Sequence, residues 1–450
     1  EVKLVLPFVL YNIVLGKRGE AMKVCVMSLG CKVNIYESEY VISLLKDNGF
    51  EIVNDDEKAD IYIINTCSVT NESDRKSRKL IHHARRENND AIIVVMGCYS
   101  QIKYKDIEMD ADIVIGNKDK SLIVELINEY MKKKEKIERI YDLSKQEFEQ
   151  MEIRHFENHT RAFVKIQDGC NAFCSYCIIP YTRGRIRSKK EDDVLREVSN
   201  LVKAGYKEIV LTGIHTGKYG MDIDTNLESL LRKLISISGL YRLRLSSIEI
   251  NEITDGILDL MAHSDVIANH LHIPLQSGSD RILKLMNRRY DKSYFIKRVS
   301  EIRKIRPDIS ITTDLIVGFP GETEDDFNET LDTLREIGFT KIHTFPYSKR
   351  DNTKAALMKE QIPGNIKKRR VHEVLELSSL GEKKYYEQFI GQILEGVSEV
   401  RKDGRIVVHT SNFIPIVVDD KINNNEIVLV RLGRIEKEMG YGQVCEIIKV

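Results

Sequence analysis

Three cysteines within one short segment constrain this chain more than any other feature. Cys170, Cys174 and Cys177 have the spacing C-x3-C-x2-C, and they directly follow an apolar segment, 162–167, with the pattern of a buried strand. Three thiolates can bind three irons of a four-iron cluster and leave the fourth iron open to a substrate. There are two alternatives to such a cluster: a zinc site completed by a distant His, and buried thiols that bind no metal.

The region that begins with this segment alternates apolar runs and amphipathic stretches. Strands are predicted at residues 162–167, 207–211, 241–245, 269–273, 309–317 and 341–345. Six βα units predict a partial (β/α)6 TIM-type barrel, in which active sites lie at the carboxyl ends of the strands. Since the three cysteines follow the first strand, this context favours the open cluster.

Small and polar residues also follow the other predicted strands. They lie in the segments 212–215, 246–249, 274–277, 318–322 and 346–349. The segment from Gly318 has another interpretation, because a turn and a helix cap need the same residues, with Thr323 as the cap and Asp326 three residues later. As a set, these strand ends predict a binding surface.

A second cysteine set lies in an earlier α/β region. Strands are predicted at 23–29, 60–65, 91–96 and 112–115, with helices near 36–48, 71–87 and 118–134. The alternation predicts a parallel, flavodoxin-like domain. Cys31, Cys67 and Cys98 each follow a strand, where open α/β sheets bind ligands, so we interpret them as metal ligands rather than three exposed thiols. Cys25 falls inside a predicted strand and Cys445 inside the β-rich end of the chain, so both are expected in cores.

Changes in composition divide this α/β multidomain chain. Residues 1–21 are predicted to be an upstream extension, because their apolar run is too short to span a bilayer and Met22 begins the first strand. The predicted parts are then the first α/β domain (22–135), a charged linker (136–159), the barrel domain with a charged helix at its end (160–390) and a small β-barrel (391–450).

Charge and cysteine usage limit the partners. Lys plus Arg and Asp plus Glu both number 69, so no overall field attracts nucleic acid or a membrane, and contacts with RNA must use local patches. Eight grouped cysteines predict metal ligation in a reducing compartment, the cytoplasm. Five basic residues follow the cysteine loop, and they could form a basic rim that contacts phosphates. The alternative is ordinary solvated surface. The residues are Arg183, Arg185, Arg187, Lys189 and Lys190.

Together, these regions resemble the radical S-adenosylmethionine (SAM) methylthiotransferase family over residues 22–450. The motifs at 30–34 (Gly-Cys-Lys-Val-Asn), 161–170, 270–278 and 345–350 are most similar to the branch that acts on threonylcarbamoyladenosine in tRNA. The isopentenyladenosine branch usually has Gly-Cys-Gln-Met-Asn at the first site. Asn352 stands where the family usually has Gly, so a turn with positive φ is expected there. The terminal barrel resembles the RNA-binding TRAM domain.

The resemblance implies a methylthio transfer to C2 of the adenosine at position 37, in the anticodon loop. It implies a 4Fe-4S cluster at each cysteine set, one SAM that methylates sulfur at the Cys31, Cys67 and Cys98 cluster, and a second SAM that is cleaved at the other. A low-potential donor such as flavodoxin or ferredoxin is then required. The resemblance also places six residues near SAM: Tyr176, Gly213, Ser247, Gln276, Ile316 and Gly318.

Other functions share these features. The same cysteines would serve a methylthiotransferase for isopentenyladenosine or for an aspartate of a ribosomal protein. A non-enzymatic iron-sulfur protein that senses redox state and binds RNA would need neither an open iron nor the SAM contacts. The terminal barrel has eight Lys plus Arg and nine Asp plus Glu from Ile393 onward, so RNA binding there would rely on a patch and on shape.

Overall fold

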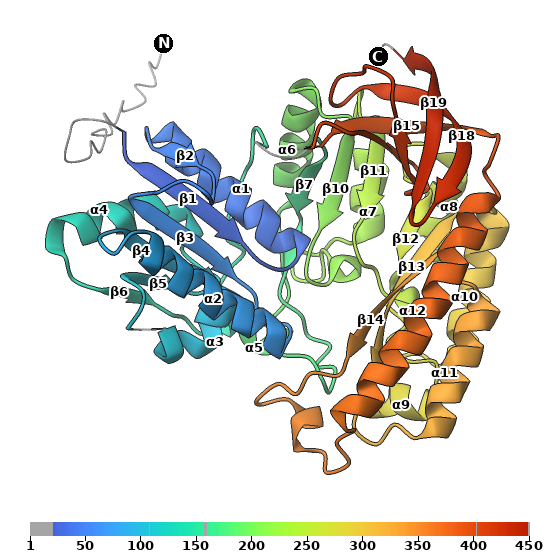
Figure 1. Cartoon of the computed structure of the whole chain (residues 1–450), viewed down its shortest axis with the longest axis horizontal. Coiled ribbons are helices and arrows are strands. Elements are labelled where there is room, and N and C mark those ends of the chain that lie inside the picture. Colours follow the sequence, from blue (N-terminus) through green and yellow to red (C-terminus); the bar gives the residue numbers. More distant parts are fainter. Residues whose placement is uncertain (1–20, 108, 157–159, 402, 449–450) are drawn as a thin grey trace. The chain divides into compact units, whose positions relative to one another are not determined.

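The computed structural model describes residues 21–107, 109–156, 160–401 and 403–448 (Figure 1). They form two compact units: residues up to Lys145 with Glu149–Ile153, and Gln146–Phe148 with the residues from Arg154 onward. Of the predicted extension, only Ala21 lies among the described residues. No helix in these ranges is long and apolar enough to cross a membrane.

The first unit contains one sheet of six parallel strands in the order β2-β1-β3-β4-β5-β6. The strands are β1 (Lys23–Ser28), β2 (Glu51–Val53), β3 (Ile61–Thr66), β4 (Ile92–Gly97), β5 (Ile113–Ile115) and β6 (Ile137–Arg139). The helices are α1 (Lys32–Asp47), α2 (Asn71–Glu87), α3 (Cys98–Ile107) and α4 (Ile123–Lys133). The order of β1 to β5 confirms the flavodoxin-like prediction. The sequence reading missed β2, β6 and α3.

The central strands of this sheet are buried on both faces. Every residue of β3 and β4 is buried. Ile61 and Ile63 pack into one core, whereas Tyr62 and Ile64 pack into the other. A parallel sheet covered by helices on both sides needs such continuous apolar runs, which is why these strands were predictable.

The predicted linker, 136–159, is partly wrong. Its first residues form β6 at the edge of the sheet. Further along, the main-chain oxygen of Met151 accepts a hydrogen bond from the Tyr36 hydroxyl at 2.8 Å, and Glu149 accepts one from the Ser121 amide at 2.9 Å. These contacts make much of the segment part of the first unit. Residues 157–159 lie outside the described residues.

The second unit contains the six predicted parallel strands of the partial barrel. They are β7 (Ala162–Lys165), β10 (Glu208–Thr212), β11 (Arg242–Leu245), β12 (His270–His272), β13 (Ser310–Val317) and β14 (Lys341–Pro346). They form two sheets, β11-β10-β7 and β12-β13-β14, and a parallel bridge from Leu243 to Ile267 links the first sheet to the segment before β12. A short antiparallel pair, β8 (Gln167–Asp168) with β9 (Arg187–Ser188), closes the base of the cysteine loop.

Helices surround these strands in Figure 1. They are α5 (Ile179–Arg183), α6 (Glu191–Lys203), α7 (Leu227–Leu234), α8 (Asp255–His263), α9 (Asp280–Leu285), α10 (Lys292–Ile305), α11 (Glu324–Ile337) and α12 (Gly364–Glu387). Thr323 and Asp326 form the capping box of α11, as expected from the segment after Gly318. Asn352 has φ 67°, which confirms the turn with positive φ.

The chain ends in a closed five-stranded barrel with the order β15-β16-β17-β19-β18. Its strands are β15 (Ile393–Val400), β16 (Ile406–Thr410), β17 (Pro415–Val418), β18 (Ile427–Glu436) and β19 (Met439–Ile448), which confirms the predicted small β-barrel. Its core includes Tyr386 and Phe389, at the end of α12 and just beyond. Cys25 is buried as predicted, but Cys445 is exposed, so its assignment to a core is wrong.

A turn of this small barrel closes the amino ends of the strands of the partial barrel. Glu208 pairs with Arg242 and Arg244, at 3.2 and 2.8 Å. The two guanidinium groups also donate to main-chain carbonyls of residues 409–411, at 3.1–3.3 Å. The ring of Phe413, in the same turn, lies 4.7 Å from the Arg244 guanidinium. Charged groups and an aromatic ring therefore join the two barrels.

Candidate functional site

The cysteine loop begins at a turn that only glycine fits. Gly169 has φ +72°, and a Cβ there would lie 1.9 Å from the main-chain oxygen of Arg185. The next residue, Cys170, donates its amide to the oxygen of Gly184 at 3.0 Å. The loop therefore folds back on itself at the carboxyl end of the first barrel strand, where the sequence predicted it.

A second segment holds the middle of the loop. The Asn287 side-chain amide donates to the main-chain oxygens of Ala172 and Phe173, at 3.3 and 3.2 Å. Ser175 donates its amide to the oxygen of Met286 at 3.0 Å. Phe173 has φ 48°, so the backbone is also held in a left-handed turn between two cysteines. The protein itself therefore shapes the loop around its three thiols.

Two cationic side chains contact the cysteine sulfurs. His215 Nδ1 lies 3.2 Å from Cys170 Sγ, and Arg288 Nη1 donates to Cys174 Sγ at 3.4 Å. Burial, with the like charges of Cys174 and Cys170, raises the pKa of Cys177 to about 12. The two cations therefore lie where a metal held by thiolates would bring negative charge.

The donor set is of the kind that holds an iron-sulfur cluster. Across the described ranges, no three His, Cys, Asp or Glu side chains converge closely enough to hold one metal ion. In a four-iron cube each cysteine binds a different iron, so its ligands stand farther apart than those of one ion. Three cysteines on one loop, two of them with cationic neighbours, supply thiolates of the kind that bind three irons of such a cube.

The six predicted SAM contacts lie on the loop and at the carboxyl ends of the strands. Gly213 follows β10, Ser247 follows β11 and Gln276 follows β12, while Ile316 lies near the end of β13 and Gly318 directly follows that strand. Gln276 has φ 66°, and its main-chain amide donates to the main-chain oxygen of Asp314 at 2.9 Å, so this turn is tied to β13. Tyr176 packs against a core cluster that contains Phe319 and Tyr347. Their contact with SAM remains a prediction.

Buried polar atoms without partners also lie at these strand ends. Among the described residues, such atoms include Ser246 Oγ, Glu252 Oε2 and Arg288 Nη2. A buried polar group without a partner costs about 1–3 kcal/mol, so such atoms point to a polar ligand. SAM, with its ribose, amino and carboxylate groups, is a ligand of that kind.

The sequence reading did not single out the ionisable residues around Cys174. A hollow beside this cysteine is lined by His215, Lys218, Glu249, Glu252, Arg288 and Arg289. Glu252 lies 2.7 Å from His215 Nε2 and 3.4 Å from Lys218 Nζ. Although burial alone would lower it, the contacts with Cys170 and Glu252 raise the pKa of His215 to about 10. His215 and Glu249 belong to the strand-end segments that the sequence indicates, whereas the two arginines lie beyond α9, outside those segments.

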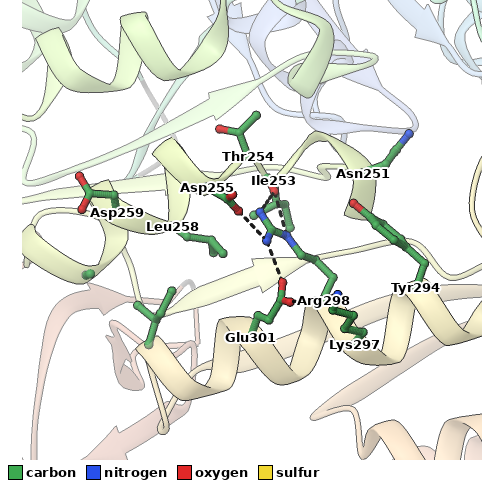
Figure 2. A pocket seen from close by; sticks show the side chains of 12 residues that line it. Asn251, Ile253, Thr254, Asp255, Leu258, Asp259, Tyr294, Lys297, Arg298 and Glu301 are labelled. Atoms are coloured by element: carbon green, nitrogen blue, oxygen red, sulfur yellow. Dashed lines mark hydrogen bonds and ion pairs between the residues drawn. The ribbon is translucent and has the colours of Figure 1, made fainter.

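A separate hollow of about 790 Å³ lies outside the barrel, between α8 and α10 (Figure 2). Arg298 reaches into it but is already neutralised, because its Nη1 lies 2.8 Å from both Asp255 and Glu301. Its guanidinium also donates to the oxygen of Ile253, and Figure 2 shows these contacts converging on it. The hollow holds none of the cysteines, so we assign the chemistry to the other site.

The predicted basic rim is reduced to two residues. Arg183 and Arg187 are buried and contact Asp168, at 3.3 and 3.6 Å. Lys189 is buried too and pairs with Glu197 at 2.5 Å. These three cations neutralise carboxylates inside the protein, so their predicted contact with phosphates is wrong. Arg185 and Lys190 are exposed.

In the first unit the other three cysteines lie at the carboxyl ends of three neighbouring strands of the sheet. Cys31 caps α1 after β1, Cys67 follows β3, and Cys98 begins α3 after β4. Since β1, β3 and β4 are neighbours, the three positions flank the point where the strand order reverses, the usual ligand site of such sheets. Burial, together with the charges of Cys98 and Cys31, raises the pKa of Cys67 to about 11.

The motif at 30–34 has a structural reason. Gly30 has φ +106°, and a Cβ there would lie 2.9 Å from Cys67 Sγ, so only glycine lets the two cysteine loops approach. The side-chain amide of Asn34 donates to the main-chain oxygens of Leu29 and Thr66, at 2.6 and 3.0 Å, and so ties the loops together. The cysteines are thus held near each other by the backbone, as a cluster requires.

Two family models match this chain. The model described as the Radical SAM superfamily matches residues 164–334, and the model described as "Uncharacterized protein family UPF0004" matches residues 23–116. The first covers the strands around the Cys170 loop, and the second covers the domain with Cys31, Cys67 and Cys98. The chain is therefore similar to known proteins in both cysteine-bearing regions.

Curated relatives match over nearly the whole chain. The threonylcarbamoyladenosine tRNA methylthiotransferase MtaB of Bacillus subtilis (strain 168) is 41% identical over 94% of this chain and 96% of that protein. MtaB of Aquifex aeolicus (strain VF5) is 39% identical over 88% and 96%. A tRNA-2-methylthio-N(6)-dimethylallyladenosine synthase of Carboxydothermus hydrogenoformans is 38% identical over 79% and 82%.

A solved structure supports the fold alone. The radical S-adenosylmethionine methyltransferase TsrM from Kitasatospora setae has a TM-score of 0.54 and 16% identity, over 75% of this chain and 77% of that chain. The likeness confirms the multidomain α/β architecture around a radical SAM barrel.

Proposed function

This chain belongs to the radical SAM methylthiotransferase family, and we propose that it adds a methylthio group to C2 of N6-threonylcarbamoyladenosine at position 37 of tRNA. The main support for this proposal is the 41% identity, over 94% of this chain, to an enzyme named for that nucleoside. It is supported by two sets of three cysteines, each at the carboxyl ends of parallel strands. A radical suits this carbon, because its aromatic C–H bond is neither acidic nor electrophilic enough for polar chemistry.

We further propose a 4Fe-4S cluster at each cysteine set. Cys170, Cys174 and Cys177 would hold the cluster that supplies one electron for the cleavage of SAM, and the set around Cys67 would hold the one that carries sulfur. The protein's own part is to position the reactants. His215 and Arg288 orient thiols, the strand ends after β10 to β13 surround SAM, and the exposed Arg185 and Lys190 meet tRNA phosphates.

The proposal implies an electron donor and a compartment. Clusters of this type work at the negative end of the iron-sulfur potential range, so a low-potential protein such as flavodoxin or ferredoxin would reduce them. Free thiols at six ligand positions need a reducing environment, for which the cytoplasm is the expected place.

A second candidate substrate is N6-dimethylallyladenosine in tRNA. The relative from Carboxydothermus hydrogenoformans is 38% identical, close to the 39% of MtaB from Thermotoga maritima. Both reactions would use the same cysteines, so the difference lies in what the site accepts at N6. An aspartate of a ribosomal protein, or redox sensing without catalysis, has no comparable observation behind it.

The test is an anaerobic reaction of the reconstituted protein with dithionite, SAM and a sulfide source. Three tRNAs of one sequence are compared, with threonylcarbamoyladenosine, dimethylallyladenosine or unmodified adenosine at position 37. We expect the methylthio product only from the first, by mass spectrometry of nucleosides. Product from the dimethylallyl tRNA alone would replace the proposed substrate, and an absence of 5′-deoxyadenosine would reject the enzyme as proposed.

A further inference from the structure

We propose that Arg289 binds the carboxylate of the threonylcarbamoyl group and so determines which modified adenosine the site accepts. The inference rests on the proposed function. Arg289 is exposed and lines the hollow that contains Cys174. It directly follows Arg288, whose guanidinium donates to Cys174 Sγ at 3.4 Å, so it lies next to the place where the reactive carbon must be held.

The charges of this hollow leave Arg289 available. Arg288 pairs with Glu249 at 2.9 Å, and Lys218 lies 3.4 Å from Glu252. Among the described residues, Arg289 makes no ion pair or hydrogen bond of its own, and no further carboxylate lines the hollow. The lining thus has one more Lys or Arg cation than it has carboxylates, and the surplus belongs to Arg289 at the exposed rim of the hollow.

The chemistry of the nucleoside brings an anion to this rim. C2 and C6 of adenine both flank N1, so a base whose C2 reaches the cluster loop carries its N6 substituent nearby. The threonylcarbamoyl group ends in a carboxylate, whereas the dimethylallyl group is a hydrocarbon. A planar guanidinium binds a carboxylate through two parallel hydrogen bonds, which gives both affinity and geometric selection.

An RNA phosphate is the other anion that Arg289 could meet, and the two sources predict different results. A contact with phosphate strengthens the binding of every tRNA by the same factor. A contact with the threonine carboxylate strengthens only the tRNA that carries it. The ratio of two affinities therefore identifies the anion.

The experiment measures the dissociation constants of the reconstituted full chain for two tRNAs that differ only at position 37, with threonylcarbamoyladenosine or unmodified adenosine. Arg289→Gln should reduce the preference for the modified tRNA roughly tenfold, the effect of losing one charge-assisted contact at a partly exposed site. Arg289→Lys should retain part of the preference, because it keeps the charge but loses the bidentate geometry. Arg185→Gln is the matched control: this exposed cation should change both affinities equally.

Three outcomes are separable. If the wild-type enzyme methylthiolates the threonylcarbamoyl tRNA but Arg289→Gln leaves the preference intact, the inference about Arg289 is wrong while the proposed function stands. If Arg289→Gln weakens both tRNAs equally, the residue binds phosphate and the inference is also wrong. If the wild-type enzyme fails on that tRNA, the proposed function itself fails.

Discussion

The two ends of the partial barrel use the same kinds of charged residue to opposite effect. At the amino ends of the strands, Glu208 is fully engaged by Arg242 and Arg244, and a turn of the small barrel covers all three. At the carboxyl ends, Arg288 has a buried nitrogen without a partner in the described structure, and Arg289 is exposed. The charges around Glu208 are thus paired within the protein, whereas a buried nitrogen of Arg288 keeps unused hydrogen-bonding capacity among the described residues.

The difference teaches where stability and chemistry lie in this fold. A charged group whose partners are all present in the protein fixes the structure, whereas one that lacks partners awaits a ligand. Changes at the amino ends should therefore alter folding and spare turnover, and changes at the carboxyl ends should do the reverse.

The largest expected effect is at the carboxyl ends. Cys174→Ala should abolish SAM cleavage, because two thiolates cannot hold the open cluster in place. Cys67→Ala should leave 5′-deoxyadenosine formation detectable and remove methylthiolation, because it affects only the other unit. Chromatography of 5′-deoxyadenosine and of tRNA nucleosides measures both activities, with Cys445→Ala as an exposed-cysteine control. Equal loss of both activities in Cys67→Ala would argue against separate roles.

At the amino ends, Glu208→Gln should lower the free energy of unfolding by about 3–5 kcal/mol, since it leaves two buried guanidinium groups without their carboxylate. Urea unfolding followed by circular dichroism measures the change. SAM cleavage per folded molecule should stay at the wild-type level. The exposed pair of Glu72 and Arg75 supplies the control, since Glu72→Gln should change little. If Glu208→Gln instead lost most SAM cleavage while its free energy of unfolding stayed at the wild-type value, the amino ends would not serve stability alone.

Acid should weaken the same junction. Despite the cost of burial, the guanidinium groups of Arg244 and Arg242 lower the pKa of Glu208 to about 2. A carboxyl with a lowered folded-state pKa stabilises fully above its unfolded value and loses that effect as pH falls. The unfolding free energies of wild type and Glu208→Gln should therefore converge by about 3 kcal/mol between pH 5 and 2. A difference that is independent of pH would show that Glu208 is not the titrating group.

The smallest expected effect concerns Phe413. Its ring stacks on His270 at 4.8 Å and on the Arg244 guanidinium, so Phe413→Ala should cost about 1–2 kcal/mol. Phe413 also has φ 67°, which favours glycine. Phe413→Gly should therefore recover about 1 kcal/mol relative to Phe413→Ala. Thermal unfolding of both variants measures the difference, and no recovery would mean that the backbone relaxes when the ring is removed.

The fold was largely predictable because long apolar runs mark buried parallel strands. Six barrel strands and four strands of the first sheet follow from that pattern. The two edge strands, β2 and β6, lack such a run because they are short and largely exposed or half-buried. The positions of the cysteines at strand ends followed from the same reasoning. The cysteine ligand roles themselves, and the contacts with SAM, remain predictions.

Side-chain pairing was not predictable in the same way. Arg183 and Lys189 look like a surface patch in sequence, and only the fold reveals that Asp168 and Glu197 neutralise them. Arg288 lies 114 residues after Cys174, so no local pattern links the guanidinium to the sulfur. Sequence shows which residues can carry charge, but the partners come from tertiary contacts.

The core shared by α12 and the small barrel has a consequence for dissecting or recombining this protein. A cut at residue 391, where the composition changes, would separate Tyr386 and Phe389 from the strands they pack against and would uncover Arg242 and Arg244. The small barrel is therefore not an exchangeable module with a border at that residue. A chimaera that preserves folding would have to exchange α12, the barrel and the strand starts beneath it as one inherited block.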